Sequence, residues 1–130
     1  MRFTNRIYLN EQVDMQKLGN LILSFFKEEG FITQRINLDH TQIIQAKKGG
    51  IMRALLSTTK GFTVIVKGDP NNIDVIMGIR EWIEEDSESR LKTAIKTPFS
   101  FFEPVPEAIW AYELEHHLWN HLETNIELGI

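Results

Sequence analysis

The fold of this chain is decided by one stretch, Phe31 to Lys67, which reads FITQRINLDHTQIIQAKKGGIMRALLSTTKGFTVIVK. Three pairs of turn-forming residues divide it into four short apolar segments: Asp39-His40, Gly49-Gly50 and Lys60-Gly61. Short apolar runs separated by two-residue turn signals are typical of strands joined by hairpins. The stretch therefore predicts four consecutive antiparallel strands.

The residues before this stretch predict a strand and then a helix. Residues 2–9 alternate apolar and polar positions imperfectly, as a strand does, and Asn10 follows as a plausible helix N-cap. From Val13 onward, apolar residues recur at spacings of three and four until Gly30, a residue that often follows the last helical turn. We expect a strand over residues 2–9 and a helix that ends at Gly30.

The residues after the stretch predict two further helices. Asp69-Pro70 is typical of a helix start, and a stripe at helical spacing follows it at Ile73, Ile76, Met77, Arg80 and Ile83. From Pro106 a second stripe runs to about Glu127, through Trp110, Ala111, Leu114, Leu118 and Leu122. The expected fold is α+β, an antiparallel sheet in the order β-α-β-β-β-β-α with an additional C-terminal helix.

Both faces of the predicted sheet are apolar at its centre. Two-residue turns place Ile36 opposite Ile43, Ile43 opposite Leu56 and Leu56 opposite Ile65 on one face. Ile44, Leu55 and either Val64 or Val66 line up on the other face, because successive side chains of a strand point to opposite sides. Since the first two helices can cover only one face well, the C-terminal part is expected to cover the second face or to pair with another subunit.

Length and composition predict one soluble domain. The chain has 130 residues, of which 42% are hydrophobic and 25% charged, and we expect a module over residues 1–86 followed by an apolar extension and helix over 87–130. It contains no cysteine, which excludes disulfides, thiol catalysis and cysteine-ligated metals and fits a cytoplasmic location. No run of apolar residues is long enough for a membrane span. The net charge of −4 disfavours nucleic acid as a partner.

The last helix carries a possible metal site. Glu113, His117 and His121 stand at positions i, i+4 and i+8, with His116 beside them, so their side chains can point at one ion such as zinc. The paired His-Glu-x-x-His pattern of metalloproteases is absent. One alternative is the polar border of an amphipathic helix, and another is a pH-sensitive contact, since histidine titrates near neutrality.

Two other groups of residues are candidates for binding. Four basic residues gather at one end of the sheet in the assumed register and suggest an anion site, although lysines often only protect sheet edges: Lys47, Lys48, Arg53 and Lys67. An apolar ligand or an interface could involve sheet residues together with the aromatic tail: Ile44, Leu55, Phe101, Phe102, Trp110, Leu114 and Leu118. No catalytic constellation stands out, since Ser57-Thr58-Thr59 has no glycine-flanked nucleophile elbow.

The order strand, helix, four strands, helix over residues 3–84 resembles the repeat unit of the TATA-binding-protein-like fold class, which includes helix-grip ligand-binding proteins. Residues 45–50 and 68–72 are similar to small prokaryotic modules that have a lysine-glycine hairpin and a Gly-x-Pro-Asn sequence before the second helix. Those modules have no assigned activity. The DNA-binding saddle of the TATA-binding protein consists of two such units with a basic concave face, whereas this chain has one unit and a negative charge.

Three functions remain open at this level. The first is a non-enzymatic interaction module, a homodimer that associates through the second sheet face and the last helix. The second is a helix-grip carrier of a small apolar ligand or lipid, and the third is a metal-binding protein or enzyme that uses Glu113, His117 and His121. The position of the last helix relative to the sheet should discriminate among them.

Overall fold

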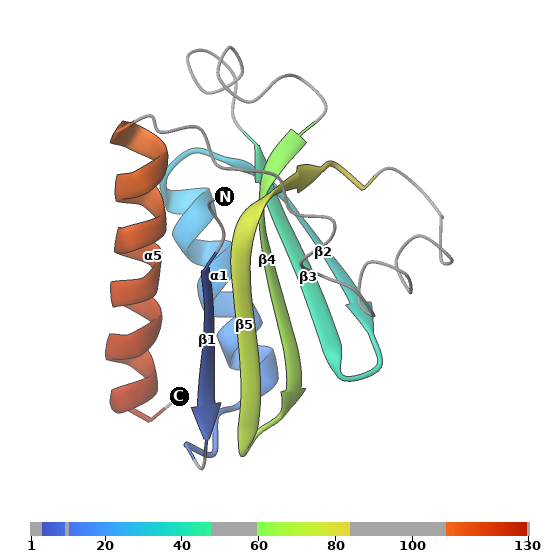
Figure 1. Cartoon of the computed structure of the whole chain (residues 1–130), viewed down its shortest axis with the longest axis vertical. Coiled ribbons are helices and arrows are strands. Elements are labelled where there is room, and N and C mark those ends of the chain that lie inside the picture. The colour runs from blue at the N-terminus through green and yellow to red at the C-terminus, as the bar shows by residue number, and fades with distance from the viewer. Residues whose placement is uncertain (1–3, 10, 48–59, 84–108, 130) are drawn as a thin grey trace.

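The structure, a computed structural model, describes residues 4–9, 11–47, 60–83 and 109–129. Its helices and strands follow the order β1 (Thr4–Leu9), α1 (Met15–Glu28), β2 (Ile32–Leu38), β3 (Thr41–Lys47), β4 (Lys60–Asp69), β5 (Asn72–Glu81) and α5 (Ile109–Glu127). The predicted α+β class and the order β-α-β-β-β-β-α are thus confirmed (Figure 1). No helix within the described ranges is long and apolar enough to cross a membrane.

The five strands form one antiparallel sheet in the order β1-β5-β4-β3-β2. The predicted pairing of Ile36 with Ile43 is confirmed. Ile43, however, pairs on its other side with Ile65, and not with Leu56, which lies outside the described residues. Ile65 in turn pairs with Ile76 of β5. The predicted register is therefore correct for the first hairpin and wrong beyond it.

The helix predicted to start at Asp69-Pro70 is in fact β5. A tight turn joins β4 to β5: Gly68 has φ 117°, and the Asp69 carboxylate accepts a hydrogen bond of 2.9 Å from the N–H of Asn71. An aspartate followed by proline suits a turn as well as a helix start, because proline fixes φ near the value that both require. The buried apolar residues of β5 repeat with the period of two that a strand has, since Ile73, Val75, Met77 and Ile79 all lie on one face.

The predicted turn at Lys60-Gly61 is also wrong. Both residues belong to β4, where they pair with Glu81 and Arg80 of β5. The strand predicted before that turn lies outside the described residues. The four strands that follow α1 therefore extend further along the sequence than the four predicted between residues 31 and 67. The last of them, β5, occupies the residues of the second predicted helix.

Local signals fix both ends of α1. The Asp14 carboxylate caps the first turn by accepting a 3.0 Å hydrogen bond from the N–H of Lys17, so the N-cap is Asp14 and not Asn10. At the other end Gly30 has φ 85°, as predicted for the residue after the helix. The N–H of Phe31 then reaches back to the carbonyl of Phe26 at 3.0 Å, and the two rings pack edge to face.

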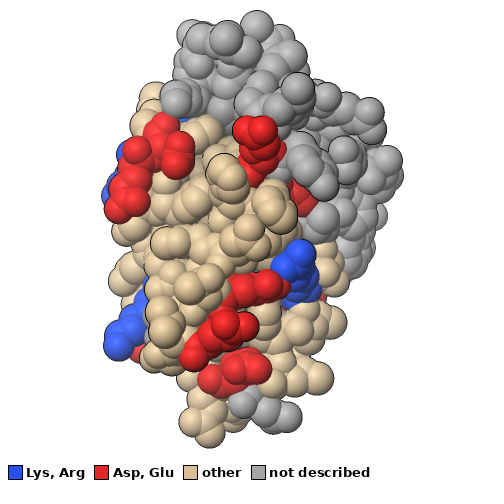
Figure 2. All heavy atoms as spheres, turned by 90° about the vertical axis from the view of Figure 1, so that its left-hand side faces the viewer, with Lys and Arg blue, Asp and Glu red and all other residues tan. Residues whose placement is uncertain are grey.

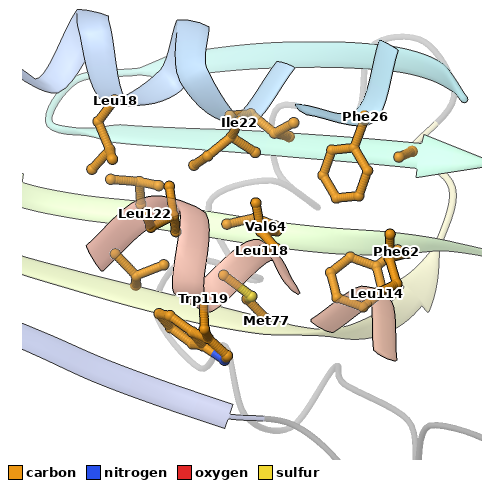
Figure 3. Packing of buried hydrophobic residues seen from close by; sticks show 14 of the residues in the cluster. Leu18, Ile22, Phe26, Phe62, Val64, Met77, Leu114, Leu118, Trp119 and Leu122 are labelled. Carbon is orange, nitrogen blue, oxygen red and sulfur yellow. The ribbon is translucent and has the colours of Figure 1, made fainter. Parts of the chain in front are cut away.

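Helices α1 and α5 both pack on one face of the sheet and bury the main core (Figure 3). Leu18, Ile22 and Phe26 of α1 point toward the sheet, as do Leu114, Leu118 and Leu122 of α5, and all six are buried. The sheet contributes fully buried residues that include Phe62, Val64 and Met77. The C-terminal helix therefore packs on its own chain, beside α1, and does not cover the second face.

The second face of the sheet is apolar at its centre, as predicted. Ile43, Ile65 and Ile76 are fully buried there, and Ile36, Leu38 and Ile83 pack against them. Ile44, Val64 and Val66 are equally buried on the opposite face. Because the central isoleucines of the second face are already out of contact with solvent, they are not a free surface for a partner.

Candidate functional site

The structure gives no support to the predicted metal site. Glu113 and His117 are exposed on α5, whereas His121 is half-buried with its ring 5.6 Å from the ring of Phe25 on α1. In the part of the chain that the structure describes, no group of three or more acidic, histidine or cysteine side chains could hold a metal ion. His121 therefore has a packing partner, which agrees with the polar-border interpretation of this helix.

The predicted basic cluster is not assembled by the two members that the structure describes. Lys67 pairs with Thr41, at the start of β3, whereas Lys47 is the last residue of that strand. The Lys47 ammonium lies 4.2 Å from the ring centroid of Trp82, and that of Lys67 lies 3.9 Å from the Asp74 carboxylate. Lys48 and Arg53 lie outside the described residues. The two ends of β3 are too far apart for one anion to contact both lysines.

The residues predicted to line an apolar site are core residues where the structure describes them. Ile44 and Leu118 are fully buried and Leu114 is 8% exposed, all in the cluster between the helices and the sheet. Leu55, Phe101, Phe102 and the side chain of Trp110 lie outside the described residues. An apolar ligand would have to displace packed side chains to reach the three that are described.

A buried polar network closes the end of the sheet where β5 finishes. The Gln45 side chain is fully buried; its amide nitrogen donates to the Thr63 hydroxyl at 3.0 Å and to the Glu81 carbonyl at 2.9 Å. Its oxygen accepts from the Gln34 amide at 2.7 Å and from the backbone N–H of Ile83 at 2.8 Å. All four hydrogen-bonding positions of the Gln45 amide are thereby used. The Gln45 amide therefore holds backbone at the end of β5 and has no free position for a substrate.

The free edge of β1 carries two of the four large apolar side chains that are exposed among the described residues. Among them, β1 pairs with β5 on one side only. Ile7 and Leu9 are 58% and 59% exposed, and they share the face opposite the helices. Large apolar side chains this exposed, next to each other on a sheet edge, are typical of a protein contact surface. We call this strand with its outward edge the β1 edge.

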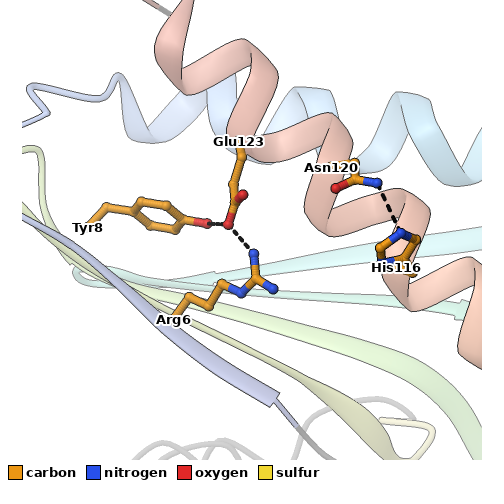
Figure 4. A network of polar contacts seen from close by, with 5 residues as sticks. All are labelled: Arg6, Tyr8, His116, Asn120 and Glu123. Atoms are coloured by element: carbon orange, nitrogen blue, oxygen red, sulfur yellow. Dashed lines mark hydrogen bonds and ion pairs between the residues drawn. The ribbon is translucent and has the colours of Figure 1, made fainter.

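The other face of β1 carries a polar cluster shared with α5 (Figure 4). The Arg6 guanidinium forms an ion pair with the Glu123 carboxylate and lies 4.6 Å from the ring centroid of Trp119. The Tyr8 hydroxyl donates to the same carboxylate at 3.3 Å. Burial, and then the negative charge of Glu123, raise the pKa of Tyr8 to about 12. Tyr8 is therefore neutral at physiological pH, and the cluster anchors β1 to α5.

The sequence pattern predicted the first strand and left open which of its faces is buried. In the structure Tyr8 and Arg6 face α5, which leaves Ile7 and Leu9 on the opposite side. The signal that could have found this surface is the aromatic ring of Tyr8, which stands between the two aliphatic residues and competes with them for the core.

Comparisons with family models, curated proteins and solved structures find no match to this chain. The geometry of the β1 edge and the chemistry of its side chains therefore carry the assignment of function.

Proposed function

We propose that this protein is a non-enzymatic interaction module that self-associates through the β1 edge. The observation that carries the proposal is the exposure of Ile7 and Leu9 at 58% and 59% on an edge strand, whereas β3, β4 and β5 bury their central apolar side chains. Leaving two large aliphatic side chains in water forgoes about 1 to 2 kcal/mol each relative to burial. Contact with a second copy recovers that free energy.

The polar groups of the described residues support a binding role more than a catalytic one. Burial is the largest cause of each resolved pKa shift, upward for Tyr8 and downward for Arg35 and Arg80. The shift of Tyr8 moves its pKa further from neutrality, which is the wrong direction for a general acid or base. Its neighbours Arg6 and Glu123 are committed to each other.

The charge of α5 supports a protein partner and not a nucleic acid. This helix contains four glutamates and no lysine or arginine. Figure 2, which views the molecule from the α5 side, shows acidic side chains spread over this face. A polyanion would be repelled there, and the net charge of −4 acts in the same direction.

We also propose membership of the TATA-binding-protein-like fold class. Two features support it: the element order β-α-β-β-β-β-α and the position of both helices on one face of the sheet. We further propose a cytoplasmic location, which the absence of cysteine from the sequence supports.

Sedimentation velocity over a range of concentrations tests the proposed function. We expect the full chain to be a dimer at micromolar concentration and to dissociate on dilution. Substitution of Leu9→Ser should shift the equilibrium toward monomer, whereas Leu128→Ser, at a 78% exposed leucine near the end of α5, should not. A wild-type protein that remains strictly monomeric at hundreds of micromolar would refute self-association.

A further inference from the structure

We infer that two copies of this chain pair their β1 strands antiparallel about a two-fold axis at Ile7, which forms one continuous sheet with five strands from each copy. This inference rests on the proposed self-association and adds to it the partner strand, the register and the residue on the axis. Four features of the β1 edge support it: backbone direction, register, charge and apolar contact.

The backbone of β1 leaves alternate residues free to pair outward. The Asn5 side-chain amide donates to the carbonyl of Val75 at 3.1 Å, which places that carbonyl on the side of β5 that faces β1. In an antiparallel ladder the N–H and C=O of a residue point to the same neighbouring strand. The backbone N–H and C=O groups of Val75 and of its partner Arg6 therefore point toward each other. The N–H and C=O of Ile7, one residue further along β1, therefore point away from β5. Ile7 is thus suited to pair with a second β1.

The symmetry of an antiparallel pair allows few registers. Two residues that stand opposite each other must have their side chains on the same face of the sheet. Because the faces alternate along a strand, the two residue numbers are either both odd or both even. An axis at Arg6 places two guanidinium groups against each other, which is unfavourable. An axis at Tyr8 overlaps only residues 7–9 within the strand bounds of Thr4–Leu9. An axis at Ile7 overlaps residues 5–9 and keeps like charges apart.

Charges on the helix side of the sheet complement one another in this register. Arg6 stands opposite Tyr8 of the partner subunit, and within each copy the Tyr8 hydroxyl lies 3.3 Å from the Glu123 carboxylate. Each Arg6 thereby approaches the Glu123 of the partner subunit while it keeps its own. Both side chains retain exposure for such a contact, at 45% for Arg6 and 39% for Glu123. Two ion pairs become one alternating network across the axis.

Apolar side chains come together on the opposite side of the sheet. Ile7 meets Ile7 of the partner subunit on the axis, and the Leu9 side chains reach the same cluster along the diagonals of the ladder. All four are exposed in the single copy. The strand also lacks the usual defences of an open edge, since TNRIYL contains no proline or lysine and its arginine is paired with Glu123.

Cysteine crosslinking tests the register directly, because the natural chain has no cysteine. Opposed residues that exchange backbone hydrogen bonds have Cα atoms about 5.5 Å apart, within disulfide range. Ile7→Cys should form a disulfide-linked dimer at least tenfold faster than Ile32→Cys, the matched control at a 63% exposed isoleucine on the opposite edge strand β2. Equal rates for both, or faster crosslinking by Tyr8→Cys, would overturn the register.

A charge substitution tests the same interface without crosslinking. Ile7→Lys places two ammonium groups on the axis and should weaken the dimer at least tenfold in sedimentation, whereas Ile32→Lys should leave it unchanged. Both positions are exposed, and circular dichroism should show both variants folded. A dimer that is insensitive to Ile7→Lys overturns both the β1 pairing and the β1 edge as the contact surface, and leaves only self-association through another surface. A wild-type protein that stays monomeric overturns both the β1 pairing and self-association. The β1 edge would then be a binding surface for an extended segment of a different protein.

Discussion

The Gln45 side chain on β3 holds the backbone of Ile83: its amide oxygen accepts the N–H of Ile83 at 2.8 Å, two residues past the end of β5. Its amide nitrogen also donates to the Glu81 carbonyl. A single buried side chain thus fixes both the last residue of β5 and the course of the chain beyond it. Ile83 is placed so that it packs against the central isoleucines of the second face.

Gln45→Leu should therefore destabilise the protein by about 2 to 4 kcal/mol, because each buried backbone group that loses its partner costs about 1 to 3 kcal/mol. Urea-induced unfolding measures the change. Gln16→Leu, at an exposed position of α1, is the matched control and should change stability by no more than about 0.5 kcal/mol. A similar small effect for both variants would show that the network contributes little.

Gly19 is required for the packing of α1 on the sheet. A Cβ atom at this position would collide with the side-chain oxygen of Gln42 and would lie 2.6 Å from an Arg35 nitrogen. The Gln42 amide cannot easily retreat, since it is buried and its nitrogen donates to the Met15 carbonyl at 2.7 Å. For a Gly19→Ala substitution, the higher helix propensity of alanine would therefore stabilise the protein, whereas the collision of its Cβ would destabilise it.

Gly19→Ala should lower the free energy of unfolding by about 1 to 3 kcal/mol, since overpacking outweighs the gain of about 1 kcal/mol in helix propensity. Ser24→Ala, on the exposed side of the same helix, should be slightly stabilising. In a Gln42→Ala background the loss caused by Gly19→Ala should shrink, because the colliding oxygen is gone and only the Arg35 nitrogen remains close. Additive effects in that double-mutant cycle would contradict the collision.

The sequence predicts the first part of the fold well and the second part less well, for identifiable reasons. Helix α1 has an apolar stripe and a closing glycine that agree, so its existence could be predicted, although its N-cap is Asp14 and not the predicted Asn10. Residues 72–81 contain apolar positions that satisfy both a period of two and a period near 3.6. Pairing with β4 and β1 on either side decides in favour of the strand, and this pairing is a tertiary effect that no local pattern contains.

The candidate site was harder to predict than the fold. Residues that suggest chemistry in a sequence, such as His121 and Lys47, turn out to contact aromatic rings within the same chain. Ile7 and Leu9 look like ordinary core residues of a strand. Only the placement of Tyr8 against α5 turns them outward, and this depends on contacts between residues more than a hundred positions apart.

Because α5 packs against its own sheet, substitution of a buried leucine on this helix should destabilise the protein far more than substitution of the exposed leucine that follows it. Leu118 is fully buried beside α1 and the sheet, and Leu118→Ala should destabilise the protein by about 3 kcal/mol through lost burial and the cavity that remains. Leu128→Ala, at a leucine that is 78% exposed, should have almost no effect. Chemical denaturation of both variants measures this. A small loss for Leu118→Ala would mean that α5 does not contribute to the core.

The raised pKa of Tyr8 predicts a loss of stability at high pH. Below its ordinary pKa of 10.0 the phenol is neutral in both the folded and the unfolded chain, so it causes no pH dependence. Between pH 10 and about 12 the unfolded chain loses the proton first, and the free energy of unfolding falls as pH rises. Tyr8→Phe should abolish this part of the decline. Glu123→Gln should reduce it only partly, since burial is the larger cause of the shift. Thermal unfolding at a series of pH values, together with tyrosinate absorbance of the folded protein, measures both effects; a Tyr8 signal that titrates near pH 10 would show that the phenol is not held against α5.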